Sequence, residues 1–153
     1  MELPIRAASP LTIPVKLDSQ EIPHIVVSAC LEVHKLLGPH LVRDAYKECL
    51  AQELHMKEML FDREVPVEIL YKGRRVKSAF TFDFIVEHQL VVEIQTFAEG
   101  DLGLKEHHKD RVSSLLRLSG YETALLVNFG AADIRNGIKR LIVSGSEPAL
   151  HWR

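Results

Sequence analysis

The spacing of apolar residues changes along the chain from a helical period to a strand period. From Ile22 onward they recur every three or four positions until Gly38-Pro39, which predicts a helix that ends at this dipeptide. A second helix is expected after a short gap, so the two helices should be neighbours. The apolar side of this second helix is formed by Val42, Ala45, Tyr46, Cys49, Leu50 and Leu54.

Beyond the second helix the apolar period becomes two, which is typical of strands. Lys72-Gly73 is predicted to be a tight turn between the first two strands. The expected elements are strands at 65–71, 76–86 and 90–97, a helix at 104–118, a strand at 123–129, and a helix or strand at 138–143.

This order, α-α-β-β-β-α-β, predicts an α/β fold with a central mixed sheet flanked by helices. We expect one domain over residues 20–145. Residues 1–19 contain Pro4, Pro10 and Pro14 and are predicted to form an N-terminal arm, and residues 146–153 a C-terminal tail.

Composition limits the classes of function. The chain has 153 residues, 46% hydrophobic and 26% charged, with a formal net charge of -2. This balance excludes a protein that coats nucleic acid by bulk charge, although it allows a local basic groove. No apolar run approaches the roughly 18 residues of a membrane span, so no membrane partner is expected. Cys30 and Cys49 lie inside predicted helices and indicate a reduced, cytoplasmic protein.

Two carboxylates face each other in the predicted hairpin of the second and third strands. If the hairpin is centred on His88, its apolar residues pair on one face and set the register. The same register places Asp83 opposite Glu93, with Cβ atoms about 4.5–5.5 Å apart. The apolar pairs are Phe82 with Ile94, Phe84 with Val92, and Val86 with Leu90.

Two carboxylates across a ladder repel each other unless one is protonated or a cation lies between them. Asp83, Glu93 and the carbonyl oxygen of Ile94 would suit Mg²⁺, with Mn²⁺ as a substitute. Gln95, on the same face, could hold a metal-bound water or a phosphate. The alternative is an exposed sheet face on which the acids coincide without a role.

An extended strand ending in Asp, followed by a strand with Glu-x-Gln where Glu-x-Lys is usual, resembles the PD-(D/E)XK nuclease superfamily. Within it, the chain is similar to the family named for its GxxExxY motif. The resemblance implies a restriction-endonuclease-like domain and metal-assisted hydrolysis of phosphodiesters. The matching stretches are residues 31–39, 46–50, 65–73, 82–86, 91–94, 116–129 and 138–142.

The departures from the family pattern fall on its polar positions. Of the GxxExxY motif only Tyr46 is present, and Arg43 stands where the acid is expected. Gln95 replaces the lysine and Arg111 replaces a glutamine, whereas His108 matches a histidine common in the family. A guanidinium beside the carboxylates would compete with a metal for them, and it also suits a phosphate. The resemblance therefore implies a weakened or abandoned nuclease.

Two function hypotheses follow. The first is a divergent nuclease in which Asp83 and Glu93 hold Mg²⁺, Gln95 orients water, and basic residues bind the phosphates of a nucleic acid. The second is a non-catalytic module for nucleic-acid binding or protein assembly, with a homodimer formed through the N-terminal arm or an edge strand. The predicted phosphate-binding residues are Arg43, Lys109 and Arg111.

The densest basic segment is residues 71–77, on a predicted hairpin. Together with basic residues of the later helix it could line a groove that follows phosphates. The alternative is an ordinary solvated hairpin. The helix residues concerned are Lys105, Lys109, Arg111 and Arg117.

Overall fold

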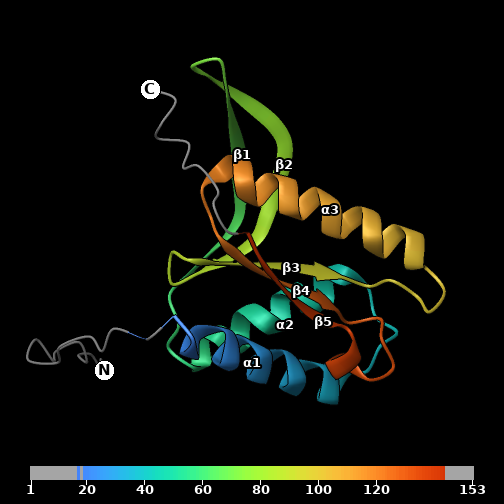
Figure 1. Ribbon diagram of the computed structural model, residues 1–153. Helices are drawn as coiled ribbons and strands as arrows, with labels where there is room; N and C mark the ends of the chain where they lie inside the picture. Colours follow the sequence, from blue (N-terminus) through green and yellow to red (C-terminus); the bar gives the residue numbers. More distant parts are fainter. Residues whose placement is uncertain (1–16, 18, 144–153) are drawn as a thin grey trace, which may run out of the picture.

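A five-stranded mixed sheet separates two layers of helices in the computed structural model, which describes residue 17 and residues 19–143 (Figure 1). Helices α1 and α2 cover one face of the sheet, and α3 crosses the other. The helices are α1 (Glu21–Leu37), α2 (Arg43–Met56) and α3 (Leu102–Ser119), and a 3₁₀ turn, η2, spans Ile134–Asn136. The strands are β1 (Phe61–Tyr71), β2 (Arg74–Val86), β3 (Leu90–Gln95), β4 (Thr123–Asn128) and β5 (Ile138–Ile142).

The strands lie in the sheet in chain order, from β1 to β5. Strands β3 and β4 are parallel and every other pair is antiparallel. A parallel pair requires a crossover connection, which α3 provides. The predicted fold class is therefore confirmed, and the last element, left open as helix or strand, is a strand that follows a 3₁₀ turn.

The largest boundary error of the sequence analysis concerns β1, which starts four residues before the predicted residue 65. Asp62 and Glu64 are exposed charged residues, so this part of the strand lacks an apolar run. Its pairing with β2, from Phe61 opposite Val86 onward, makes it a strand. Tertiary pairing outweighs the local pattern here.

The predicted β2–β3 register is confirmed for the pairs next to the turn, whereas the predicted pair of Phe82 with Ile94 does not form, since these residues lie in different core clusters. Val86 lies opposite Leu90, Ile85 opposite Val91, and Phe84 opposite Val92. All three pairs satisfy the predicted hairpin centre at His88, where the chain reverses with positive φ at Glu87 and His88.

The prediction that Phe82 shares a face with Phe84 is wrong. Phe84 packs on the side of α1 and α2, whereas Phe82 packs with Val112 of α3. Glu64 of β1, between the rungs that pair with these two phenylalanines, has a φ of 52°. The regular β2–β3 pairs also stop at Phe84, so strict alternation of side chains is interrupted between the two phenylalanines, and Phe82 lies in the opposite layer.

Both cysteines are free, and Cys30 is buried in the core against α1 and α2. Burial raises the pKa of the Cys30 thiol to about 12.

Within the described residues no helix is long and apolar enough to cross a membrane. The predicted tail, and the predicted arm apart from residues 17 and 19, lie outside the described residues. Strands β1 and β5 are the edges of the sheet, and dimerisation through an edge stays a prediction.

The junction between α1 and α2 is held by Tyr46, which is fully buried. Its hydroxyl donates to the carbonyl oxygen of Gly38 and accepts the N–H of Leu41 at 3.1 Å. Its ring stacks on Phe129 of the β4 end, with centroids 4.5 Å apart. Tyr46 thus fixes where α2 begins, and α2 carries the basic side chains of the site described below.

Replacing Tyr46 with Phe should lower the free energy of unfolding by about 1–2 kcal/mol, because two part-buried backbone groups lose their partner. Urea or guanidinium denaturation measures this. Tyr71→Phe is the matched control, since Tyr71 is 61% exposed and its loss should cost less than about 0.5 kcal/mol. Equal effects of the two substitutions would contradict the assigned role.

Candidate functional site

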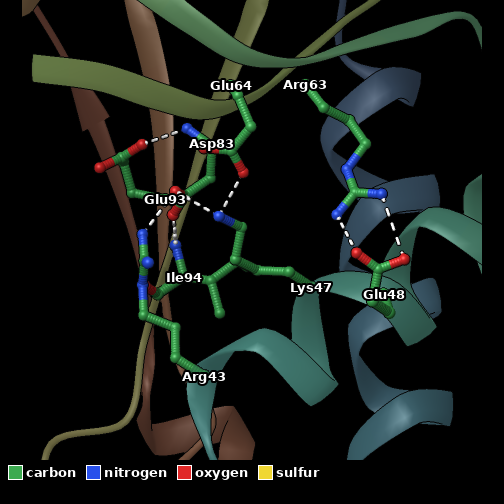
Figure 2. Close-up of polar contacts among 8 residues, drawn as sticks. All are labelled: Arg43, Lys47, Glu48, Arg63, Glu64, Asp83, Glu93 and Ile94. Carbon is green, nitrogen blue, oxygen red and sulfur yellow. Dashed lines mark hydrogen bonds and ion pairs between the residues drawn. The ribbon is translucent and has the colours of Figure 1, made fainter.

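Asp83 and Glu93 bridge β2 and β3 where the paired rungs of the ladder stop (Figure 2). The N–H of Asp83 donates to Oε2 of Glu93, and the N–H of Ile94 donates to Oδ2 of Asp83, both at 2.7 Å. Side-chain oxygens thus take the place of backbone carbonyls at this point. The two carboxylates converge as the sequence predicted, and both are buried, at 1% and 7% exposure.

Helix α2 places two cations against this pair. Arg43 donates from Nη2 to Oδ1 of Asp83 at 2.5 Å and from Nε to the carbonyl oxygen of Ile94 at 2.7 Å. Lys47, one helical turn further, lies with Nζ 3.4 Å from the same Oδ1 and also pairs with Glu64 of β1. Figure 2 shows both side chains reaching from α2 toward Asp83. Of the groups expected to hold a metal, Asp83 and the carbonyl oxygen of Ile94 are therefore bound by cationic side chains.

The position of α2 against β1 is secured by a two-point ion pair. Arg63 donates to both carboxylate oxygens of Glu48, at 2.7 and 3.3 Å, and its guanidinium lies 5.5 Å from the centre of the Phe84 ring. Bidentate pairs of this kind fix orientation as well as distance. They keep the face of α2 that carries Arg43 and Lys47 directed at the carboxylates.

Burial decides the charge of Glu93. Burial and then the neighbouring charge of Asp83 raise the pKa of this carboxyl, the N–H of Asp83, Arg43 and Lys47 oppose them, and the net pKa is about 8. Glu93 is therefore protonated at neutral pH. The remaining charges, Asp83 and Glu64 against Arg43 and Lys47, balance without any further ion.

This arrangement does not fit Mg²⁺. The predicted ligand set offers five oxygens: two each from Asp83 and Glu93, and the carbonyl oxygen of Ile94. Arg43, Lys47 or backbone N–H groups contact four of these oxygens, and only Oε1 of Glu93 has no such contact among the described residues. A divalent cation would add two positive charges to a site already balanced by two basic side chains. Among the described residues there is also no group of three or more His, Cys, Asp or Glu suited to a metal.

A cleft of about 230 Å³ opens beside the carboxylates, between β2, β3 and α3. Arg111 enters it from α3, with its guanidinium 5.0 Å from the centre of the exposed Phe80 ring. Gln95 is half-buried, and its amide forms no hydrogen bond with any described residue. The other polar lining residues are Arg43, Thr81, Glu93 and His108.

His108 is buried at 8% exposure, and its Nε2 has no hydrogen-bond partner within the described part of the chain. Burial, followed by the charge of Arg111, lowers the pKa of His108. The imidazole is therefore neutral at neutral pH and can donate or accept one hydrogen bond at the unpartnered atom.

The predicted phosphate-binding residues are not all brought together. Arg43 and Arg111 line the same cleft, whereas Lys109 lies in a neighbouring pocket and pairs with Glu106 at 3.2 Å. Asp44, adjacent to Arg43 in sequence, is exposed. Most of the basic hairpin at 71–77 is exposed as well.

Sequence reasoning missed Lys47 and Glu64. Lys47 lies four residues after Arg43 and three before Leu50, which places it near the apolar side of the predicted helix. A lysine is rarely buried without a charged partner, so this position was a signal for a buried ion pair. Glu64 gave no such signal, because its segment lay outside the predicted strand.

Comparison with known proteins gave one family match. A model of the PD-(D/E)XK nuclease superfamily matches residues 20–141, from α1 into β5. No curated protein and no solved structure matches the chain.

The raised pKa of Glu93 predicts a pH-dependent stability. Between its ordinary value of 4.5 and about 8, the folded protein keeps a proton that the unfolded chain releases, so stability falls as pH rises through this window. Glu93→Gln stays neutral and should lack this loss, on the order of a few kcal/mol. Denaturant unfolding of both proteins between pH 5 and 9 measures the difference. Parallel profiles would contradict a buried, protonated Glu93.

Proposed function

The chain belongs to the PD-(D/E)XK nuclease superfamily, and from that premise we propose that it binds the phosphodiester backbone of a nucleic acid without hydrolysing it through a metal ion. The observation that carries this proposal is the position of Arg43. Its guanidinium engages Asp83 and the carbonyl oxygen of Ile94, two of the three groups that were expected to hold Mg²⁺.

The loss of metal chemistry follows from charge. Asp83 is almost completely buried and has two cationic partners on the same oxygen. Releasing Arg43 to admit a metal would break a buried ion pair, and doing so typically costs several kcal/mol. A tethered side chain also acts at a high effective concentration, which a free ion at millimolar concentration does not match.

The affinity for phosphate follows from the same pairing. Because the acids are neutralised by Arg43, Lys47 and a proton, the cleft presents the spare donors of two guanidiniums without an opposing negative charge. The Arg43 side chain is 38% exposed, and its Nη1 has no hydrogen-bond partner among the described residues. Guanidinium groups match phosphate oxygens in geometry and charge.

The two arginines would approach a phosphate from different elements. Arg43 extends from α2 and is held by Asp83 of β2. Arg111 extends from α3 and packs on the Phe80 ring. Gln95, at the end of β3, would add an amide donor from the floor of the cleft. Membership of the GxxExxY family is part of the proposal only as a prediction, because Tyr46 is the one motif residue present.

Oligonucleotide binding should be equally strong in EDTA and in Mg²⁺, with no cleaved product in either. Fluorescence polarisation measures binding, and denaturing gels detect cleavage. Arg111→Gln should weaken binding about tenfold or more, since a charge-assisted contact to phosphate is lost. Lys35→Gln, which removes one charge from α1, a helix that does not line the cleft, should have little effect. Cleavage that requires Mg²⁺ or Mn²⁺ would instead favour a retained nuclease.

Arg43→Glu should create a metal site, because three acids would then face one another and Asp83 would keep Lys47 as its one remaining ion-pair partner among the described residues. Millimolar Mg²⁺ or Mn²⁺ should raise the Tm of this variant by several degrees and leave the wild-type Tm unchanged. Arg43→Gln is the control, since it removes the guanidinium without adding an acid. Calorimetric binding of either metal to the wild type would refute the proposal that Arg43 replaces it.

A further inference from the structure

A second pocket adjoins the arginine cleft at the carboxyl ends of the parallel strands β3 and β4. Its volume is about 240 Å³, close to that of the first cleft. It lies beside the first turns of α3, and its floor includes Asn128 of β4. The carboxyl ends of parallel strands are a common place for ligands in α/β folds. Its charged lining residues are Lys105, Glu106, Lys109 and Lys139.

The two pockets share a wall made of Gln95 and His108, since both residues line both pockets. The half-buried Gln95 forms no side-chain hydrogen bond with any described residue, so its amide is open to a ligand that spans the wall. His108 is more than nine-tenths buried, and its Nε2 lies beneath the surface without a hydrogen-bond partner among the described residues.

The second pocket carries an excess of positive charge. Glu106 pairs with Lys109, whereas Lys105 and Lys139 form no ion pair with any described residue. Because Lys139 comes from β5 and Lys105 from α3, their charges enter the pocket from two elements. This pocket therefore suits an anionic group, as the arginine cleft does.

Each pocket also combines its cations with an aromatic ring. Phe80, which is 40% exposed, lines the cleft of Arg111. The half-buried Phe97 lines the lysine pocket, and the centroid of its ring lies 5.9 Å from that of His108. Basic grooves with aromatic rings at intervals are typical of proteins that bind single strands, because unpaired bases can stack on the rings.

We propose that the two pockets take neighbouring nucleotides of one single-stranded nucleic acid, with the backbone passing over Gln95 and His108. This inference rests on the proposed function and adds the class of ligand to it. A single strand can bend its phosphates into adjoining hollows, whereas the phosphates of a duplex lie on a stiff, convex surface.

The test is fluorescence polarisation with a labelled oligothymidylate of about twelve nucleotides, a duplex of the same length, and thymidine monophosphate as competitor. The double variant Lys105→Gln, Lys139→Gln should bind the oligothymidylate about tenfold more weakly and show a salt dependence reduced by about two ion contacts. The monophosphate can occupy the arginine cleft alone, so the double variant should weaken its binding less than that of the oligothymidylate. Arg111→Gln should weaken both ligands, and Lys35→Gln neither.

The outcomes separate the two proposals. If the double variant binds the oligothymidylate like the wild type while Arg111→Gln does not, the second pocket is refuted and the proposed function stands. Tighter binding of the duplex than of the single strand would likewise refute the ligand class. If the wild type binds no oligonucleotide, the proposed function fails and this inference fails with it. Thermal unfolding of each variant verifies that the fold is intact.

Discussion

The structure depends on one buried negative charge, the carboxylate of Asp83, and on how it is compensated. At 1% exposure this group has left water, and an uncompensated charge in that position would destabilise the domain. Arg43, Lys47 and the N–H of Ile94 supply the compensation. The contacts come from α2 and β3, so the same interaction that neutralises the charge also joins the helical layer to the sheet.

This compensation changes the electrostatic sign of the site. A pair of ionised acids attracts a divalent cation, whereas a pair in which one acid is protonated and the other bound to two cations does not. The guanidinium and ammonium groups are covalently attached, so they do not dissociate as a metal ion does. The spare donors of Arg43, with Arg111 from α3, leave a cleft suited to anions. Arg43 alone thus affects both the acids and the phosphate that would lie beside them.

The fold places these groups where a ligand can reach them. The ladder of β2 and β3 pairs near the hairpin and is replaced by side-chain bonds at Asp83 and Glu93, which opens space beside β3. The crossover through α3 makes β3 and β4 parallel, so Gln95 and Asn128 end side by side. Both pockets lie at that edge, and α3 contributes to each. The chemistry of the site is therefore set by the ends of β3 and β4 and by one helix on each side of the sheet.

The sequence by itself determined the order of elements, the α/β class, the β2–β3 register and the convergence of Asp83 with Glu93, because these follow from short-range periodicity and one hairpin. It also located Arg43 and Gln95 as departures from the family pattern. Only the tertiary structure decided that Arg43 points at Asp83, that Lys47 and Glu64 join it, that Phe82 turns toward α3, and that Lys109 lies in another pocket. Those outcomes depend on how separate elements dock and on where the β2–β3 pairing stops. Neither a period nor a spacing along the chain encodes the distance between side chains on different elements.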